Sequence, residues 1–463
     1  AIRQTLADND PSNVGWQPDL STSLERIGNI LSAQGKLDDA RAVFEKSKTI
    51  RQTLADNDPF NTVWKHNLSL SLEKIVAILL TQGKLDDAKA IFEKRLAIAQ
   101  TLAGNDPSNA RWQGDLSVSF IKIGNILSAQ GKLDDAKAVF EKSQTILQTL
   151  ADNDPSYAGW QRYLSVSLEE IGNILSAQGK LDEAKATFEK SVSIRQSLIE
   201  KMPTNTDWQH DYAVNLYQVG DALFIQNNLE EAKSVIEKSR KVFQQLTDKD
   251  SSNTEWQRNL SAVRLKAGEI LLAQEKFDEA SNLFRQSFDG IQTLLANNPD
   301  NTQWQNDLSS ILNKTGETLF AKKEYSEAEA VYKESLALSQ TLVDSDPDNT
   351  EWREQHAKNL DNFGNLLEAQ EKIEAAKTMY EAGWDNFNAL TALSPDNKHW
   401  QKGLFLAHYN LMSIALKTNS SAVAQKHGQA ALLIVKPLEK MKLLNSKQQE
   451  LSVTLRKRLT ELE

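Results

Sequence analysis

The sequence predicts an all-α solenoid, because a tryptophan recurs every 48 residues along the whole chain. The tryptophans in this register are Trp16, Trp64, Trp112, Trp160, Trp208, Trp256, Trp304, Trp352 and Trp400. A unit that repeats without a slip in register stacks end to end and does not close into a globule. Two further observations identify each unit as a helical hairpin. The apolar residues recur at helical steps, and Gly and Pro separate the two apolar stretches.

The first helix of each unit is expected to begin at an asparagine and to end at a glycine turn. In residues 13–60, Asn13 is a suitable N-cap and Gly35 suits the left-handed position after the helix. Between them one helical face is apolar: Trp16, Leu20, Leu24, Ile27 and Leu31. Pro18 fits only a first turn, so this helix should start slightly later than its siblings or carry a small distortion. The other N-caps are Asn61, Asn109, Asn205, Asn253, Asn301, Asn349 and Asn397, with Tyr157 as the exception.

The second helix of the unit is expected to follow the glycine turn directly. Its apolar and small residues again recur at helical steps: Leu37, Ala40, Phe44, Ser47, Ile50 and Leu54. Asp38 and Asp39 lie in its first turn, where acids interact favourably with the helix dipole. The sequence Asp-Asn-Asp-Pro at 56–59 ends the helix, because proline cannot continue it. Each helix has about 20 residues and is therefore about 30 Å long.

The repeat register divides most of the chain into eight complete units. These are residues 13–60, 61–108, 109–156, 157–204, 205–252, 253–300, 301–348 and 349–396. Residues 1–11 nearly match residues 49–59, so residues 1–12 are expected to be the tail of a truncated preceding repeat.

The C-terminal part of the chain departs from the repeat pattern. Residues 397–445 are expected to form a degenerate ninth repeat, in which Gly428 stands at the phenylalanine position and Pro437 interrupts the second helix. Residues 446–463 are expected to form a capping helix, because the last unit of a solenoid must cover an apolar face. One face of that helix carries Leu451, Leu455, Leu459 and Leu462.

The composition excludes several classes of function. The net charge of −10, with acids and bases mixed along the chain, argues against a nucleic-acid groove, which would need clustered Lys and Arg. The chain has no cysteine, which excludes disulfides, thiolate catalysis and zinc–thiolate sites and fits a cytoplasmic protein. No apolar run approaches the roughly 18 residues of a membrane span, so no membrane association is expected.

No group of residues points to catalysis or to a bound metal. The histidines do not form a metal-binding motif, and we expect them to be solvent-exposed or at helix ends: His66, His210, His356, His399, His408 and His427. The Asp-Asn-Asp-Pro turns lack the Gly and distal Glu of a calcium loop and are interpreted as capping turns. No Ser-His-Asp arrangement, phosphate loop or nucleophile elbow is present. We therefore expect no catalytic residue, no cofactor and no enzymatic activity.

The tryptophan stripe has two interpretations. It could be a stacking platform for bases or sugars. It also lies on the same helical face as Leu20 and Leu24, which favours packing in the core. Trp384 is the one tryptophan outside the register.

These spacings resemble the tetratricopeptide repeat family, whose pattern has a Leu-Gly pair, then Ala-x-x-x-Phe, then a Pro. The first unit matches with Gly28, Ala40 and Phe44, and the glycine recurs at Gly124, Gly172, Gly220, Gly268, Gly316 and Gly364. The second unit departs with Val76 for the glycine, and the fifth with Ile236 for the phenylalanine. The period is 48 and not the usual 34. Both helices are extended by seven residues, close to two turns, which keeps each buried stripe on one side.

The resemblance implies a right-handed superhelix with structural roles for the repeated glycines and tryptophans. The glycines would let the two helices of a hairpin approach closely. Each tryptophan would pack against the last turns of the preceding helix, near Leu54 and its equivalents.

In this family the first helices line a concave face that meets ligands, and the resemblance places two positions per unit there. The position after the glycine holds Asn29, Asn125, Asn173, Asp221, Glu269, Glu317 and Asn365. The position three residues before it holds Glu25, Glu73, Glu169, Tyr217, Asn313 and Asp361. Asparagines could hold the backbone of an extended peptide, and the acids would favour a basic or neutral segment. The alternative is that these are only solvated polar positions.

The sequence therefore favours a non-catalytic protein-interaction or scaffold domain that binds a peptide or partner protein in a concave groove. Similar bacterial arrays look like sensor or regulatory arms beside protease-like or NTPase modules. The alternative is structural self-assembly through an uncapped N-terminal face. We expect a monomer or a weak homo-oligomer.

Overall fold

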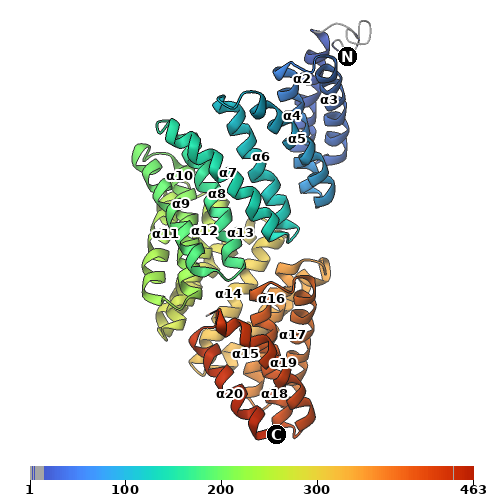
Figure 1. The fold of residues 1–463 in the computed structure, drawn as a ribbon. Helices are drawn as coiled ribbons and strands as arrows, with labels where there is room; N and C mark the ends of the chain where they lie inside the picture. The colour runs from blue at the N-terminus through green and yellow to red at the C-terminus, as the bar shows by residue number, and fades with distance from the viewer. Residues whose placement is uncertain (1–2, 4, 6–14, 442, 463) are drawn as a thin grey trace. The chain divides into compact units, whose positions relative to one another are not determined.

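The computed structural model describes residues 3, 5, 15–441 and 443–462, and within these ranges it contains helices and no strand (Figure 1). Two compact units make up the chain: an N-terminal unit, residues 1–174, and a C-terminal unit, residues 175–463. Asn13 and most of the predicted tail at 1–12 lie outside the described residues.

Nine pairs of consecutive helices follow one another among the described residues. The first helices of the pairs are α2 (Trp16–Ala33), α4 (Thr62–Thr81), α6 (Ala110–Ala129), α8 (Ala158–Ala177), α10 (Thr206–Ile225), α12 (Thr254–Ala273), α14 (Thr302–Ala321), α16 (Thr350–Ala369) and α18 (Lys398–Lys417). The second helices are α3 (Leu37–Asn57), α5 (Leu85–Asn105), α7 (Leu133–Asn153), α9 (Leu181–Lys201), α11 (Leu229–Lys249), α13 (Phe277–Asn297), α15 (Tyr325–Ser345), α17 (Ile373–Leu393) and α19 (Ser421–Lys440). A last helix, α20 (Ser446–Leu462), follows them.

Asparagine side chains cap the first helices, as the sequence predicts. Asn61 Oδ1 accepts hydrogen bonds from the backbone N–H groups of Val63 (3.1 Å) and Trp64 (3.2 Å). Equivalent caps are made by Asn109, Asn205, Asn253, Asn301, Asn349 and Asn397. Helix α2 begins at Trp16, whereas α4 begins two residues before Trp64. The later start expected from Pro18 is therefore confirmed.

The turn between the two helices of a hairpin contains one residue in the left-handed conformation. Gly35, Gly83, Gly131 and Gly179 have φ between +70° and +75°, which confirms the expectation for Gly35. In the later repeats residues with a side chain take the same place: Asn227, Glu275, Lys323, Glu371 and Asn419, with φ between +52° and +64°. These residues carry backbone strain that glycine avoids.

The repeated glycines lie where the two helices of a hairpin are closest. A Cβ placed on Gly124 would lie 2.6 Å from Cζ of the fully buried Phe140. The residue sixteen positions after the glycine makes the same close approach in the pairs Gly28–Phe44, Gly220–Ile236, Gly268–Phe284, Gly316–Tyr332 and Gly364–Tyr380. Gly172 is also buried. The second repeat has Val76 opposite Phe92 at this place, and both are buried.

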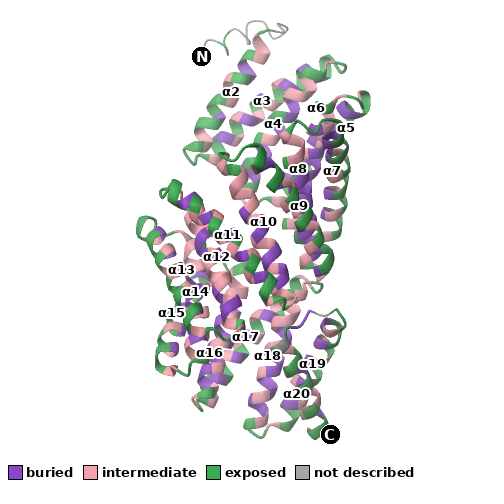
Figure 2. Ribbon diagram, turned by 90° about the vertical axis from the view of Figure 1, so that its left-hand side faces the viewer, coloured by how far each residue is buried: buried purple, intermediate pink, exposed green. Residues whose placement is uncertain are grey.

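The tryptophans pack at the other end of the hairpins, and all nine in register are half-buried. Trp64 packs against the buried Ala55, Leu68 and Leu72. Trp304 and Trp400 pack against clusters that include Leu294 and Leu390, the equivalents of Leu54. Figure 2 shows the result as buried stripes on faces of helices whose other faces are exposed.

The ninth hairpin differs from the sequence expectation at Pro437. Helix α19 is not interrupted, because it continues to Lys440 with Pro437 inside it. The proline deprives only the Leu433 carbonyl of its usual donor. The Leu433 side chain is 72% exposed, so water can satisfy that carbonyl.

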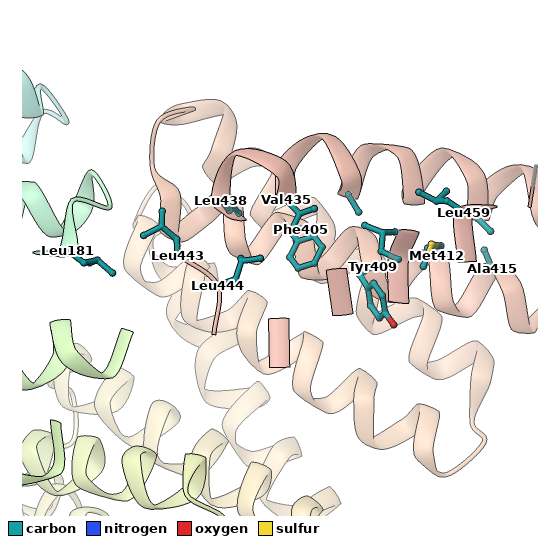
Figure 3. Close-up of a cluster of buried hydrophobic side chains, with 13 residues drawn as sticks. Leu181, Phe405, Tyr409, Met412, Ala415, Val435, Leu438, Leu443, Leu444 and Leu459 are labelled. Atoms are coloured by element: carbon teal, nitrogen blue, oxygen red, sulfur yellow. The ribbon is translucent and has the colours of Figure 1, made fainter. Parts of the chain in front are cut away.

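The end of the chain packs back onto the first residues of the C-terminal unit. Leu455 and Leu459 of α20 join a buried cluster with Phe405 and Val435 (Figure 3). The same cluster contains Leu443, in the linker before α20, and Leu181, at the start of α9. A Cβ on Gly179 would lie 2.7 Å from Leu443 Cδ1. Leu181 is buried, whereas its equivalents in seven other repeats are half-buried: Leu37, Leu85, Leu133, Leu229, Phe277, Tyr325 and Ile373.

No helix in the described part of the chain is both long and apolar enough to span a membrane.

Candidate partner-binding groove

The first helices line the inner side of the C-terminal unit. Neighbouring first helices contact each other in the pairs α10–α12, α12–α14, α14–α16 and α16–α18. The described second helices make no comparable contacts with one another. Because the first helices approach more closely than the second helices, the array curves with the first helices on the inside. The first helices of repeats five to nine therefore form a groove.

A row of alternating charges, called the charged row below, runs along this groove and consists of Asp221, Lys266, Glu269, Lys314 and Glu317. Lys266 Nζ lies 2.9 Å from Asp221 Oδ1 and 2.5 Å from Glu269 Oε2. Lys314 Nζ lies 3.8 Å from Glu269 Oε1 and 2.7 Å from Glu317 Oε2. Three acids predicted as partner-binding residues are therefore neighbours of two lysines that the sequence interpretation did not include.

Burial and pairing act against each other on the pKa values of these groups. Burial alone would lower the pKa of Lys266, but Asp221 and Glu269 outweigh it and hold this pKa well above its usual value. Burial would raise the pKa of Glu269, but Lys266 and Lys314 hold it below its usual value. Lys266 and Glu269 are therefore both charged at neutral pH, and each offsets the charge of the other.

Charges in the first and last helices of the groove interact. Burial lowers the pKa of Lys402 in α18, and the charge of Asp221 in α10 opposes this shift. The two residues belong to repeats nine and five, so the two ends of the groove lie within electrostatic reach of each other.

A pocket of about 340 Å³ opens among α10, α12, α13, α14 and α16. Its apolar wall consists of Ala262, Leu265, Ile291 and Ile311, with Tyr217 beside them. Its polar lining includes Asn306, Ser310, Arg258, Asp307, Glu351, Glu354 and Lys358. Burial raises the pKa of Tyr217 to about 12, so its hydroxyl stays protonated and can donate a hydrogen bond.

The charges around the pocket are paired to different degrees. Arg258 makes a two-point ion pair with Asp307, with Nε 2.5 Å from Oδ2. Glu354 contacts Lys358 and also accepts hydrogen bonds from His399 and Trp400 at 2.8 Å each. Burial would raise the pKa of Glu354, but Lys358 and His399 hold it far below its usual value.

Two of the predicted residues in the N-terminal unit are parts of ion pairs. Glu25 Oε1 lies 2.6 Å from NH1 of Arg51, a residue only 6% exposed. Glu73 Oε2 lies 3.1 Å from NH2 of the buried Arg95. Arg51 also donates to Asn67 O (2.8 Å) and Ser71 Oγ (3.0 Å) of the next repeat. The carboxylate of Glu25 therefore helps to hold two repeats together.

The remaining predicted residues differ in exposure. Asn29, Asn125 and Asn173 are exposed, and Glu169 is half-buried. Asn365 is half-buried and its Oδ1 accepts a hydrogen bond from the Tyr380 hydroxyl at 2.8 Å.

Asn313 and Asp361 do not lie on the groove surface. Asn313 is 2% exposed, donates to Asn359 Oδ1 and accepts from Asn362 Nδ2, both at 2.7 Å. Asp361 is 9% exposed and its Oδ1 has no hydrogen-bond partner. Burial raises its pKa to about 8, with Asn410 opposing the shift. Asn313 belongs to the interior because it forms a hydrogen-bond network with Asn359 and Asn362 of the next repeat. Asp361 lies against Gly383 of α17, where a Cβ would come 2.8 Å from its Oδ1.

The expectation for the histidines is wrong at two positions. His356 and His408 are buried in the middle of α16 and α18. His356 Nδ1 lies 3.0 Å from Ser339 Oγ. His408 accepts a hydrogen bond from Trp384 Nε1 at 3.2 Å and lies 2.9 Å from Nδ1 of His427. Each takes the place of an apolar residue and finds a polar partner there. In the described part of the chain no three potential ligands are placed to hold a metal ion.

Four segments of the chain match the tetratricopeptide repeat family, at residues 20–60, 118–146, 167–198 and 308–348. A comparison with curated proteins gives no match. Among solved structures, the apo form of RapI has a TM-score of 0.55 at 10% identity, covering 92% of this chain and 100% of that chain. A STAND protein with a tetratricopeptide repeat sensor from Pyrococcus horikoshii has a TM-score of 0.47 at 11% identity, covering 90% of this chain and 55% of that chain.

The stacked hairpins and the inner groove define an all-helical repeat solenoid. The repeats in the four matched segments are tetratricopeptide repeats, in a chain whose repeat unit has 48 residues. This repeat family indicates a protein-interaction scaffold.

Proposed function

We propose that this chain is a non-catalytic scaffold that binds a peptide or a partner protein in the groove of its C-terminal unit. The observation that carries the proposal is the groove itself, in which charged residues and hydroxyl groups stand beside a pocket with an apolar wall. Such a surface can meet several successive residues of an extended peptide. Polar side chains would bond its backbone, and carboxylates would select basic side chains.

The proposed contact residues are a revised set. Tyr217, Asp221, Glu269 and Glu317 remain from the sequence interpretation, because they are half-exposed on the first helices. Lys266 and Lys314 are added because they lie between these acids. Asn313 and Asp361 are left out because they are buried.

Asn365 in the C-terminal unit and the exposed asparagines of the N-terminal unit, Asn29, Asn125 and Asn173, are kept as proposed contact residues, each within its own unit. The sequence resemblance to bacterial arrays supports a role as the sensor or regulatory arm of a larger protein. We further propose that it acts in the cytoplasm, as a monomer or a weak homo-oligomer.

Selection of random peptides on the immobilised chain, followed by calorimetric titration, tests this proposal. We expect enriched peptides that bind one per chain, and weaker binding by Glu317→Lys. Glu334→Lys is the matched control, because Glu334 is exposed on the second helix α15. Light scattering over a hundredfold range of concentration should give a constant mass. Absence of any enriched peptide, together with a mass that grows with concentration, would instead support self-assembly.

A further inference from the structure

The pocket in the groove exists because repeats six and seven depart from the other repeats at one position. Ala262 and Ser310 line it, and both occupy the place that Thr22 holds in the first repeat. The other repeats have larger residues than Ala or Ser there: Thr22, Leu70, Val118, Val166, Val214, Lys358 and Leu406. The two small side chains therefore leave space between α12 and α14 that larger residues would fill.

A second local change makes the wall of the pocket apolar. Leu265 stands where the first, second and fourth repeats have Glu25, Glu73 and Glu169. Behind it lie Ile291 and Ile311, each 1% exposed. A volume of about 340 Å³ is at the lower end of the range for ligand pockets, which suits one or two side chains of a peptide.

The polar lining of the pocket has unused hydrogen-bonding capacity. Asn306 is 5% exposed and donates from Nδ2 to Glu351 Oε1 at 2.9 Å, while its Oδ1 accepts no hydrogen bond. A buried acceptor without a donor is costly, so the pocket lining carries an unsatisfied polar atom in the free chain. The Tyr217 hydroxyl makes no hydrogen bond to any other described residue.

The charges of the lining favour a cation beside the apolar side chain. Asp307, Glu351 and Glu354 outnumber Arg258 and Lys358. Asp307 is paired with Arg258, and Glu354 with Lys358. Glu351 is exposed, and its carboxylate forms no ion pair with a Lys or Arg of the described chain. It is therefore the carboxylate available to a ligand.

Resting on the proposed function above, we infer that this pocket anchors one aliphatic side chain of an extended peptide, with a Lys or Arg of the same peptide beside it at Glu351. The peptide is thereby recognised at one fixed point of the groove, and the charged row from Asp221 to Glu317 meets the residues on one side of that point.

Pocket-filling variants test this inference. Ala262→Leu and Ser310→Leu add carbon atoms to an existing space and should leave the unfolding midpoint of the chain unchanged. Both should weaken binding of a selected peptide about 10- to 100-fold, the effect of losing one buried aliphatic side chain. Thr22→Leu is the matched control, because it makes the same kind of change at the same repeat position outside the pocket, and it should leave binding unchanged.

Changes in the peptide provide a readout that does not depend on the fold of the variants. Replacing the anchoring aliphatic residue of the peptide by alanine should weaken binding to the wild-type chain and have little effect on binding to Ala262→Leu. Glu351→Gln should remove the preference for the adjacent Lys or Arg and reduce the salt dependence of binding.

The outcomes separate this inference from the proposed function. Tight peptide binding that is unaffected by Ala262→Leu and Ser310→Leu would overturn the anchor pocket and leave the groove function standing. Selected peptides without an aliphatic residue, or with acids in place of the basic residue, would overturn it as well. No peptide binding at all would overturn both.

Discussion

Glycine substitutions at the strained turns should stabilise the protein. Glu275, Lys323 and Glu371 have φ of +59°, +64° and +61°, where earlier repeats have glycine. A side chain in this conformation costs roughly 1–2 kcal/mol. Glycine also gives the unfolded chain more conformational freedom, which lowers the free energy of unfolding by about 0.4–1 kcal/mol and offsets part of the relieved strain. The net gain should therefore be about 0.5–1 kcal/mol at each site. Since each residue lies in its own turn, the triple glycine variant should gain about 2 kcal/mol.

Urea unfolding followed by far-ultraviolet circular dichroism measures this gain as a higher midpoint. Gly131→Ala is the reciprocal control. It places a side chain at φ +73° with nothing within 4 Å of its Cβ, so it tests backbone strain without a steric clash, and it should lower the midpoint. An unchanged or lower midpoint for the triple variant would refute the assignment of strain to these turns.

Four further predictions follow from contacts of individual residues. Glu25→Gln should cost about 3 kcal/mol in urea unfolding, because the buried Arg51 loses its carboxylate. The pair Glu25→Ile and Arg51→Leu, which copies Ile121 and Leu147 of the third repeat, should be nearly neutral. Gly124→Leu should cost about 1–3 kcal/mol through its clash with Phe140. Gly104→Leu, which meets open space, should cost much less in the same assay. Leu443→Ala should lower the free energy of unfolding by about 2–5 kcal/mol and speed proteolysis of the linker before α20, because it removes the side chain that packs in one cluster with Leu181. Asp361 holds a proton in the folded state up to about pH 8, whereas in the unfolded chain its carboxyl has the ordinary aspartate pKa of 3.8 and releases the proton there. Stability should therefore fall as the pH rises between these values, by up to roughly 1.4 kcal/mol per pH unit, and unfolding midpoints of Asp361→Asn should lack this fall.

The sequence predicts the hairpins well because each signal is local and recurs. Asn61 and Gly35 act within their own turns, so their capping and left-handed roles follow from residue type alone. Pro437 shows the limit of such reasoning. The cost of a proline inside a helix depends partly on whether the freed carbonyl finds another partner, and the exposure of Leu433 depends on tertiary packing.

The groove is less predictable because its chemistry depends on contacts between repeats. Glu25 has the residue type of a ligand contact, but Arg51, 26 residues later, engages it. The same spacing of Glu and Arg recurs at 169 and 195, and this internal repetition was a usable signal. Asn313 is buried because it bonds with Asn359 and Asn362 of the next repeat, and Asp361 lies against Gly383, which the position within one repeat does not reveal. The small residues Ala262 and Ser310 were visible in the sequence, but only the structure shows that Leu265, Ile291 and Ile311 surround the space beside them.

Cysteine protection tests the central claim, binding in the groove of the first helices, most directly. The chain has no cysteine, so a single introduced thiol reports on one position. Alkylation rates would be measured for Ser310→Cys in the groove and for Glu334→Cys on α15, with and without a saturating selected peptide. We predict that the peptide slows alkylation of Ser310→Cys and leaves the rate at Glu334→Cys unchanged. Protection of Glu334→Cys with an unprotected Ser310→Cys would contradict the account.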